Sequence, residues 1–392
     1  MGGNRPIRVL HVCTIFLTAQ TFIAPVLRYL SRHGYEAAVA CSQGSVADGP
    51  VSSGSRDIEG CRVFSVAIPR TIRPFRDFLA IRRLCQVIRE FKPDVIHTQT
   101  SKAGIVGRLA ARLAGVPVII HTAHAFPFHA YLPWPVKWAY IWIERWVAGW
   151  TDLIMVDTES VRMDGLRQRI VQDASRIVTV PMGVDLTRFS PSLSGPGTLR
   201  DALGLGTQAL VVGTVARLVP DKGLDCFLRM AAIIRAERAD VKFLIVGEGP
   251  LRQSLEQMAK SIGIGPDVVF AGHRTDIPEL MQAMDLFVLP TRREGFGVVF
   301  AEAMAMGKAT VGSDIGPIAE VVEDGVTGYL APADNPEAFA ARALALLSDD
   351  AKRYTFGEAG RRRVEQRFSQ SRMCELIEGH YRRLLVQKGL VL

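Results

Sequence analysis

Short runs of apolar residues alternate with longer amphipathic stretches along most of the chain. The runs are rich in Val, Ile and Leu, which is typical of strands buried on both faces of a sheet. In the first half they predict strands at Ile7–Cys13, Glu36–Cys41, Val63–Ala67, Val95–Thr98, Val118–His121, Leu153–Val156 and Ile177–Val180. Helical patterns separate most of these runs, for example at Thr21–His33, Phe75–Phe91 and Ala103–Ala114. This alternation predicts a mainly parallel sheet with crossover helices.

The same pattern begins again after a loop rich in Ser, Pro and Gly at Ser190–Gly197. Further strands are predicted at Leu210–Ala216, Lys242–Val246, Val268–Ala271, Leu286–Leu289 and Ala309–Gly312. A chain of 392 residues is too long for one ordinary core. We therefore expect an α/β protein with two doubly wound domains, whose ligand lies at the carboxyl ends of the strands. The expected domains are residues 1–190 and 191–370, and a final helix at 371–392 is expected to pack back toward the first.

Composition narrows the class of protein. Hydrophobic residues make up 48% of the chain and charged residues 22%, which is typical of a well-packed globular protein. Six cysteines occur without a CxxC pair, so the sequence favours a reducing compartment over a zinc site or a disulfide framework. The pattern predicts neither a signal peptide nor a membrane-spanning helix, and we expect a cytoplasmic protein.

Positive charge is concentrated in the first half of the chain. Residues 1–190 hold 23 Lys and Arg against 14 Asp and Glu, whereas residues 191–392 hold 24 against 25. A basic half of this kind indicates an anionic partner such as membrane lipid, phosphate or nucleic acid. The alternative is a solvated, arginine-rich surface without a partner. The chain has no aromatic and basic recognition motif, so we expect no nucleic-acid partner.

Two loops of the second half carry candidate phosphate-binding residues. Val246–Pro250 follows a strand and opens a helix, where Gly249 lets backbone N–H groups approach a ligand. The segment does not match the GxGxxG motif, so a dinucleotide ligand is poorly supported. Arg217 and Lys222 follow the strand Leu210–Ala216. Two cations at that edge suit a diphosphate, although an ordinary loop with surface cations has the same composition.

The stretch REGFGVVFAEAMAMG, residues 293–307, places two glutamates in an apolar segment. Gly295–Gly297 predicts a turn, and a helix is predicted from Val298 to about Met306. Glu294 would lie in the turn and Glu302 inside the helix. The helix N-terminus is a site for an anion, and carboxylates beside it accept hydrogen bonds from sugar hydroxyls. Two helix-capping glutamates are the alternative.

These motifs together resemble a known family. The spacing from Glu294 to Glu302 is similar to the E-x7-E motif of the retaining GT-B glycosyltransferases of family four, and the likeness covers essentially the whole chain. In the second half it extends to Thr214–Gly223, Val246–Pro250, Ala271–Arg274, Asp285–Pro290 and Ser313–Leu330. In the first half, His97–Gly104 and His121–His129 resemble the branch that builds capsular polysaccharide, exopolysaccharide and O-antigen.

The resemblance implies a GT-B fold, in which two Rossmann-like domains face each other across a cleft. It implies that Glu302 holds the ribose and Glu294 the donor sugar. The amides of Phe296 and Gly297 would face the sugar and the diphosphate, and Gly249 and Val298 belong to the same nucleotide-binding set. Arg217 and Lys222 would neutralise the leaving diphosphate. His124 matches the first-domain histidine that lies near the donor sugar.

The implied reaction is hexosyl transfer with retention, from a UDP-linked sugar to a glycan, as in bacterial surface polysaccharide synthesis. The implied acceptor is a polyprenyl-diphosphate-linked sugar, with an anionic membrane surface as a further partner at the inner face of the plasma membrane. No cofactor beyond the nucleotide-sugar and no metal is expected. The chain departs from many relatives at Cys13–Ala19, which lacks their paired glycines, so donor contacts from this loop are in doubt.

All five tryptophans recur at a spacing of four, at Trp134, Trp138, Trp142, Trp146 and Trp150. On a helix such a row drifts by about 40° per step. Two interpretations remain: the row packs into the core of the first domain, or part of it lies in a membrane interface, where tryptophan and cations are favoured.

Two other functions fit parts of the pattern. A sugar-nucleotide epimerase shares the two-domain fold, but the segment from Glu294 to Glu302 and the stretch from His121 to His124 argue against it. A non-catalytic, membrane-associated protein that binds nucleotide or carbohydrate would not need the complete set of Arg217, Lys222 and both glutamates.

Overall fold

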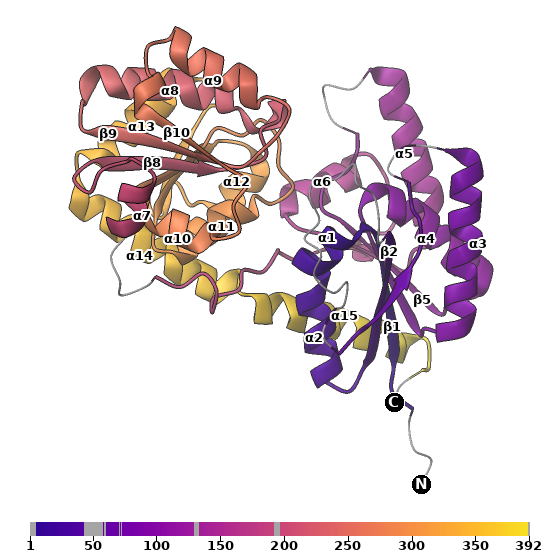
Figure 1. Cartoon of the computed structure of the whole chain (residues 1–392). Helices are drawn as coiled ribbons and strands as arrows, with labels where there is room; N and C mark the ends of the chain where they lie inside the picture. The colour runs from indigo at the N-terminus through magenta and orange to yellow at the C-terminus, as the bar shows by residue number, and fades with distance from the viewer. Residues whose placement is uncertain are drawn as a thin grey trace. The chain divides into compact units, whose positions relative to one another are not determined.

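The computed structural model describes residues 5–42, 58, 60–69, 71, 73–128, 133–191 and 197–390. The chain forms two compact units. Unit 1 comprises Met1–Pro181 and Ser371–Leu392, and unit 2 comprises Met182–Gln370 (Figure 1). The division therefore falls before the expected linker, of which residues 192–196 lie outside the described residues.

Unit 1 is built on a parallel sheet of seven strands in the order β3-β2-β1-β4-β5-β6-β7. The strands are β1 (Arg8–Ile15), β2 (Glu36–Ser42), β3 (Arg62–Ser65), β4 (Val95–Gln99), β5 (Val118–Ala123), β6 (Leu153–Val156) and β7 (Ile177–Thr179). The helices are α1 (Phe16–Thr18), α2 (Ala24–Arg32), α3 (Pro74–Phe91), α4 (Ser101–Ala114), α5 (Trp134–Ala148), α6 (Glu159–Arg167) and α15 (Gln370–Gln387). A π-helical turn, Ala19–Ile23, joins α1 to α2, and a 3₁₀ turn, Ala174–Arg176, precedes β7.

Each face of this sheet has its own hydrophobic core. Side chains of α3 and α4 pack on one face, and α2 and α15 cover the other. Figure 1 shows α3, α4 and α5 side by side. Because every strand is parallel, the chain leaves each strand at the same carboxyl edge, where α1, α3, α4 and α5 begin.

Buried polar contacts fix α15 to unit 1. The hydroxyl of Tyr381 lies 2.5 Å from Nδ1 of His97 and 3.2 Å from Nε2 of His11. Nε2 of His97 in turn lies 2.7 Å from the hydroxyl of Thr122. Burial lowers the pKa of both histidines, and that of His11 falls to about 3, so both rings are neutral at physiological pH.

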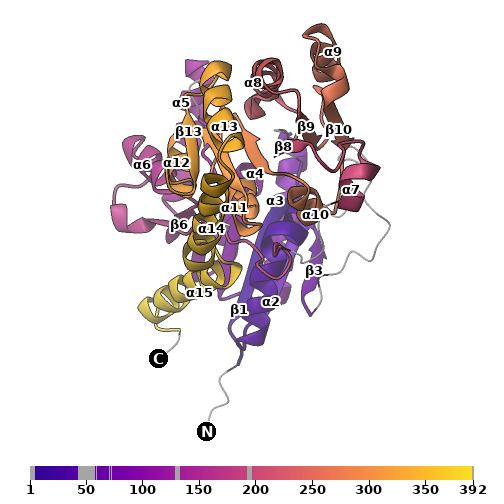
Figure 2. The ribbon, with the colours of Figure 1, turned by 90° about the vertical axis from the view of Figure 1, so that its left-hand side faces the viewer.

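Unit 2 contains a parallel sheet of six strands in the order β10-β9-β8-β11-β12-β13. The strands are β8 (Leu210–Val215), β9 (Val241–Val246), β10 (Val268–Gly272), β11 (Leu286–Leu289), β12 (Ala309–Ser313) and β13 (Gly328–Ala331). The helices are α7 (Gly197–Ala202), α8 (Leu224–Glu237), α9 (Arg252–Ser261), α10 (Ile277–Gln282), α11 (Val298–Ala305), α12 (Gly316–Val321), α13 (Pro336–Leu347) and α14 (Asp350–Arg367). Figure 2 shows β9 and β10 toward one edge of this sheet and β13 toward the other.

The tryptophan row occupies the outer side of α5. This helix buries Ile141, Glu144, Val147 and Ala148, whereas Trp134, Trp138, Trp142 and Trp146 are exposed. Trp150 lies beyond the end of the helix and is half-buried. The interpretation of the row as core is therefore wrong for four of the five tryptophans, because the buried stripe of α5 runs along the opposite side.

Candidate functional site

The two sheets each contain one point at which the strand order reverses. In unit 2 this point lies between β8 and β11, and in unit 1 between β1 and β4. Loops that leave such neighbouring strands run in opposite directions and open a crevice at the carboxyl edge, where ligands of open α/β sheets bind. The residues that follow these strands are therefore the first candidates for a site.

In unit 2 the loops after β8 and β11 touch each other. Gly223 has a φ of +63°, and a Cβ at this position would lie 1.9 Å from the carbonyl oxygen of Pro290. The hydroxyl of Thr291 donates to the carbonyl of Asp221 over 3.0 Å, and the N–H of Arg292 donates to the same carbonyl over 2.8 Å. A glycine is required at residue 223 because the backbones approach too closely for a side chain.

Lys222 and Glu294 meet at this junction and form an ion pair that is largely buried. The hydroxyl of Thr291 also lies 3.4 Å from a carboxylate oxygen of Glu294. An ammonium group has three N–H donors, so the pair leaves Lys222 able to bind a second anion. The structure thus brings together two candidate residues that lie 72 positions apart in the sequence.

Arg217 lies in the same loop and is exposed. Its guanidinium has no hydrogen-bond or ion-pair partner among the residues that the structure describes. The neighbouring loop after β9 packs closely against it, since a Cβ on Gly249 would lie 2.5 Å from the carbonyl oxygen of Leu218. The N–H of Leu218 donates to the carbonyl of Glu248 over 2.9 Å, which joins the two loops.

The turn before α11 places backbone donors at a helix N-terminus. Gly297 is the N-cap, with a φ of +82° and no side-chain capping bond, and Val298 is the first helical residue. Phe296 is buried and packs edge-on against Phe368 with ring centroids 5.3 Å apart. A Cβ at residue 297 would lie 2.5 Å from Cδ1 of Ile318. The first N–H groups of a helix have no partner within it, so those of α11 point out of its N-terminus.

Glu302 is the fifth residue of α11, and burial raises the pKa of its carboxyl to about 7, while the charge of Arg188 opposes this shift. No hydrogen bond or ion pair to its carboxyl is found within the described part of the chain. A carboxylate in such surroundings is stabilised by any ligand that donates hydrogen bonds to it. Vicinal hydroxyls of a sugar are donors of this kind.

Arg292 was not among the predicted residues, yet it organises the same loops. Its guanidinium donates to Asp225 over 2.8 Å, to Asp334 over 2.7 Å and to the carbonyl of Pro220 over 2.7 Å. Together these contacts link the turn before α8 to the loop that holds Asp334, which adopts a positive φ of 60°. Only its place two residues before Glu294 in the sequence could have indicated it.

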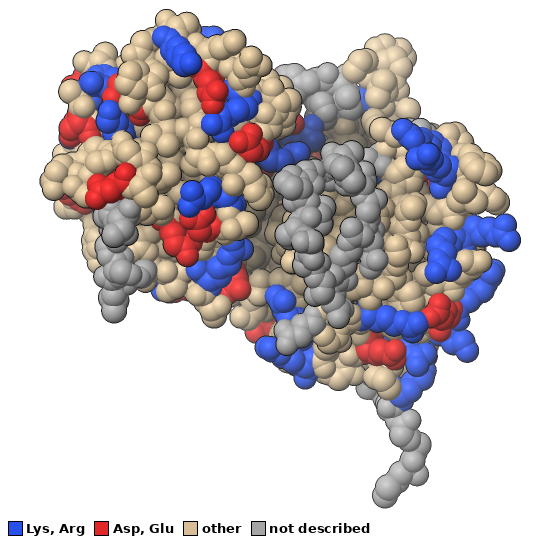
Figure 3. Space-filling model, viewed as in Figure 1, with Lys and Arg blue, Asp and Glu red and all other residues tan. Residues whose placement is uncertain are grey.

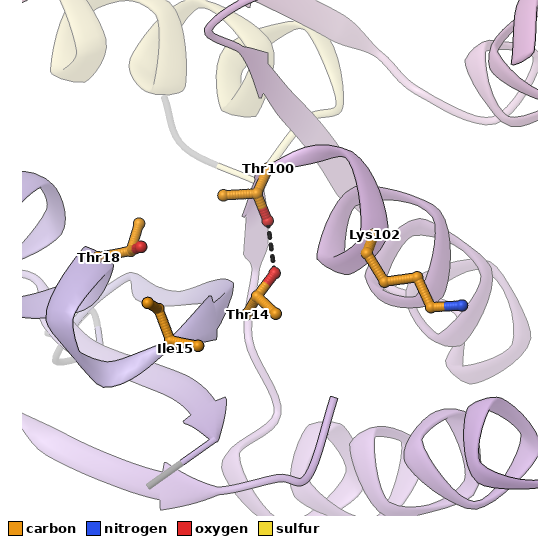
Figure 4. Close-up of a pocket in the computed structure, with 5 residues that line it drawn as sticks. All are labelled: Thr14, Ile15, Thr18, Thr100 and Lys102. Carbon is orange, nitrogen blue, oxygen red and sulfur yellow. Dashed lines mark hydrogen bonds between the residues drawn. The ribbon is translucent and has the colours of Figure 1, made fainter. Parts of the chain in front are cut away.

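The reversal point of unit 1 holds a small pocket of about 260 Å³, lined by Thr14, Ile15, Thr18, Thr100 and Lys102 (Figure 4). The hydroxyls of Thr14 and Thr100 lie 2.7 Å apart and join the two loops. Thr100 adopts a φ of +67°, which is strained for a β-branched residue, and it is the N-cap of α4. The glycine-free segment after β1 forms α1 directly, so it has no paired-glycine loop.

His124 follows β5 of unit 1. In the sheet, β5 lies beside β4, the strand that precedes Thr100 and Lys102 of the pocket. Its Nδ1 lies 2.9 Å from a carboxylate oxygen of the buried Asp157, which follows β6. Burial lowers the pKa of His124, but the charge of Asp157 and its hydrogen bond outweigh burial, and the net shift is upward. Nε2 of the ring has no hydrogen-bond partner among the described residues. Asp157 was not predicted from the sequence.

The predicted residues thus fall into two groups. His124 belongs to unit 1. The others follow the neighbouring strands β9, β8 and β11 of unit 2; they are Arg217, Lys222, Gly249, Glu294, Phe296, Gly297, Val298 and Glu302. Among the described residues, no three His, Cys, Asp or Glu side chains gather in a cluster suited to a metal ion.

Comparison with known proteins decides the family. Residues 197–363 match the family described as glycosyl transferases group 1, and residues 18–183 match the glycosyl transferase 4-like domain. An Escherichia coli protein named UDP-Gal:alpha-D-GlcNAc-diphosphoundecaprenol alpha-1,3-galactosyltransferase is 30% identical over 84% of this chain and 86% of its own. The chain belongs to the glycosyl transferases group 1 family.

Two further proteins extend the comparison. The putative glycosyltransferase EpsD of Bacillus subtilis is 28% identical over 94% of both chains. The crystal structure of Anabaena HepE in complex with UDP superposes with a TM-score of 0.80 at 23% identity, over 96% of this chain and all of the other. These comparisons confirm the expected family, its GT-B fold of two Rossmann-like domains and its glycosyltransferase activity. They favour this activity over that of an epimerase and over a non-catalytic binding protein.

Proposed function

We propose that this glycosyltransferase moves a hexosyl group from a UDP-linked sugar to a glycan carried on polyprenyl diphosphate, with retention of the anomeric configuration. The setting we infer is the synthesis of a bacterial surface polysaccharide at the cytoplasmic face of the membrane. Support comes from the E. coli relative, whose name contains both a UDP-sugar and a diphosphoundecaprenol acceptor. Further support comes from HepE, which was crystallised with UDP.

The donor would lie along the loops of unit 2. Glu302 would accept hydrogen bonds from the ribose hydroxyls, and Glu294 from hydroxyls of the donor sugar. Arg217 and the free N–H donors of Lys222 would hold the diphosphate. The amides of Phe296, Gly297 and Val298 would add donors at the start of α11, and Gly249 would let the base approach the backbone.

The proposed reaction breaks the bond between the anomeric carbon and the diphosphate oxygen. Negative charge grows on the leaving diphosphate, where fixed cations and N–H groups stabilise it. The acceptor oxygen then bonds to the same face of the anomeric carbon, and its proton passes to an oxygen of the leaving phosphate. His124, held by Asp157, would contact the donor sugar. We propose no metal and no cofactor beyond the nucleotide-sugar in this step.

The acceptor would approach from unit 1. Its pocket at the carboxyl edge is lined by three threonines and Lys102, residue types that suit a sugar or a phosphate group. Because a polyprenyl chain stays in the bilayer, an enzyme that uses this acceptor has to work at a membrane surface. The excess of positive charge in residues 1–190 suits an anionic lipid surface.

The observation that carries the proposal is the arrangement at the reversal point of the unit 2 sheet. Lys222 pairs with Glu294 beside the uncapped N-terminus of α11, and Glu302 lies unpaired in the same helix. Cations that suit a diphosphate and two carboxylates that suit polyols lie on adjoining segments, which supports the proposal.

The direct test is transfer by the purified protein from UDP-sugars to a synthetic polyprenyl-diphosphate sugar in detergent, followed by mass spectrometry and NMR of the anomeric proton. We expect an α-linked product from an α-linked donor. Glu294→Gln is expected to reduce the rate by about 10²- to 10³-fold. Glu337→Gln, at an exposed position of α13, is the matched control and should leave the rate unchanged. A β-linked product, or no transfer from any nucleotide-sugar, would overturn the proposal.

A further inference from the structure

Unit 1 exposes an unusual amount of apolar surface on two helices, α5 and α3, which α4 separates. Trp134, Trp138, Trp142 and Trp146 of α5 are 73%, 52%, 65% and 47% exposed. The rings of Trp142 and Trp146 are stacked, with centroids 6.3 Å apart. Large aromatic side chains normally bury most of their surface, so a row of four exposed tryptophans indicates a binding surface.

The first turns of α3 add to this surface. Phe75 and Phe78 are 75% and 60% exposed, and Leu79 is exposed as well. Because α3 and α5 each follow a parallel strand, both helices begin at the carboxyl edge of the sheet. This is also where the pocket lies, and α4 packs between the two helices. Lys102 at the start of α4 forms an ion pair with Asp77 of α3, which ties the starts of these two helices together.

Unit 2 has no comparable surface among its described residues. Its exposed large apolar side chains are Ile262, Val326 and Tyr354, which lie on three separate segments. Single exposed apolar residues of this kind are common on globular proteins and need no partner. The concentration on α3 and α5 is therefore specific to unit 1.

Cations accompany the apolar residues of unit 1. Arg73, Arg76, Arg82, Arg83 and Arg89 are all exposed on or next to α3. In Figure 3, Lys and Arg gather along the right-hand edge of this unit, over α3. On α5, the guanidinium of Arg145 lies 6.0 Å from the ring centre of Trp138. Aromatic residues combined with Lys and Arg are typical of surfaces that lie in the interface of an anionic bilayer.

We propose that the exposed row of α5 and the first turns of α3 together form a docking surface for an anionic lipid bilayer. We call it the α3–α5 surface. The proposal rests on the lipid-linked acceptor of the proposed function, and it adds the part of the chain that meets the lipid. Docking in this way places the carboxyl edge of unit 1, with its pocket, next to the bilayer. None of the described helices is long and apolar enough to cross a membrane.

The geometry of α5 also predicts which tryptophans enter deepest. Successive tryptophans are rotated by about 40°, so Trp134 and Trp146 differ by about 120° around the helix. A flat bilayer cannot take both to the same depth. Trp134 and Trp138 lie at the end of α5 that shares the carboxyl edge with Phe75 and Phe78, so this end would insert first. Trp146 would stay at the level of the head groups.

The chain supplies its own probe for this contact, because all five tryptophans lie between residues 134 and 150. Vesicles that contain phosphatidylglycerol should shift tryptophan emission to the blue and sediment the protein. Lipids brominated along the acyl chain should quench this emission. Trp134→Ser with Trp138→Ser should weaken vesicle binding by about tenfold or more. Arg76→Gln and Arg82→Gln should each weaken it by about fivefold, because a cation near an anionic surface contributes about 1 kcal/mol.

Val326→Ser with Tyr354→Ser, on unit 2, is the matched control and should bind vesicles like the original chain. All variants should keep their melting temperature and their response to UDP, which excludes unfolding as the cause of a loss. Absence of binding to anionic vesicles at low salt would overturn the proposal. A second result would also overturn it. If the emission shifted to the blue with rising protein concentration in the absence of lipid, and the mass in solution doubled, a second copy of the chain would cover this surface.

The docking surface and the proposed function can fail independently in these experiments. Sugar transfer to the acceptor in detergent without vesicle binding would overturn the docking surface and leave the reaction standing. Vesicle binding through the α3–α5 surface without transfer would support the surface and refute the reaction.

Discussion

At the scale of single residues, the role proposed for Glu302 in ligand binding depends on the protonation of its carboxyl. Its pKa of about 7 means that the neutral and the ionised carboxyl are both populated near pH 7 in the ligand-free protein. Ribose hydroxyls that donate to the carboxylate would stabilise the ionised form. Binding of UDP should therefore release a proton from this residue.

We expect UDP affinity to rise about tenfold between pH 6 and pH 8, because below pH 7 the ligand has to compete with the proton. Calorimetric titration across this range measures the effect. The phosphates of UDP also titrate near pH 6, so Glu302→Gln provides the baseline. An identical pH dependence in this variant would show that Glu302 is not the group involved.

The same pKa has a consequence for stability. In the unfolded chain this carboxyl ionises near its ordinary value of 4.5, and in the folded chain only near 7. Its contribution is therefore fully present below pH 4.5 and is lost as the pH rises through 7. Glu302→Gln, which cannot ionise, should be more stable than the original chain by roughly 1–3 kcal/mol at pH 8 and by much less at pH 4.5. Thermal melting at the two pH values measures this difference, and an equal effect of the substitution at both would show that the carboxylate is well solvated.

Asp157 is predicted to position His124. Its carboxylate accepts the Nδ1 hydrogen bond over 2.9 Å, which fixes the tautomer and leaves Nε2 for the substrate. Asp157→Asn preserves the shape but removes the charge, so we expect kcat to fall by about 10- to 100-fold and the pKa of His124 to fall in the pH profile. Asp173→Asn, in an exposed turn of the same unit, should change neither. An unaltered profile with reduced kcat would assign Asp157 a purely structural role.

At the scale of elements, a buried ion pair joins the tryptophan helix α5 to α4. Arg108 of α4 donates to Glu144 of α5 over 2.8 Å and to the carbonyl of Gly104 over 2.9 Å, and both charged side chains are fully buried. No other contact between charged residues of these two helices is found in the described part of the chain. This pair therefore helps to orient the exposed tryptophans, together with the apolar packing of Ile141 and Ala148.

Glu144→Ala should destabilise unit 1 by about 3–5 kcal/mol, since it leaves the charge of Arg108 buried and unpaired. Tryptophan fluorescence during urea unfolding measures this unit alone, because every tryptophan belongs to it. The double variant Arg108→Met, Glu144→Leu should recover most of the loss. A single variant as stable as the original chain would mean that water reaches the pair.

Most strands were predictable because they are buried on both faces and form continuous apolar runs. Twelve of the thirteen described strands were expected within one or two residues of their observed bounds. β13 was missed because Gly328–Ala331 is a four-residue edge strand that is only half-buried and begins with glycine. Its glycine is needed there, since a Cβ would lie 2.3 Å from the carbonyl oxygen of Thr310.

The candidate site was predictable in its residue types but not in its pairing. The segment from Glu294 to Glu302 indicated two carboxylates beside a helix N-terminus, and α11 begins at the predicted residue. That Lys222 would contact Glu294 follows only from the order of strands, which brings β8 beside β11. Arg292 and Asp157 carried no motif of their own, because their partners come from distant loops.

At the scale of the whole molecule, two units of the same architecture carry different surfaces. Unit 2 presents cations and carboxylates at the reversal point of its sheet, which suits a nucleotide-sugar. Unit 1 presents hydroxyls, exposed tryptophans and arginines, which suit a glycan on a lipid. The last helix, α15, returns the chain to unit 1, where Tyr381 is buried between two neutral histidines.

The central claim is that unit 2 binds a nucleoside diphosphate through Glu302, and its most direct test is the thermal shift of the purified protein with UDP, GDP, ADP and NAD. We predict stabilisation by UDP that is lost in Glu302→Ala and kept in Glu337→Ala. No shift with any diphosphate, or a shift with NAD alone, would contradict the account.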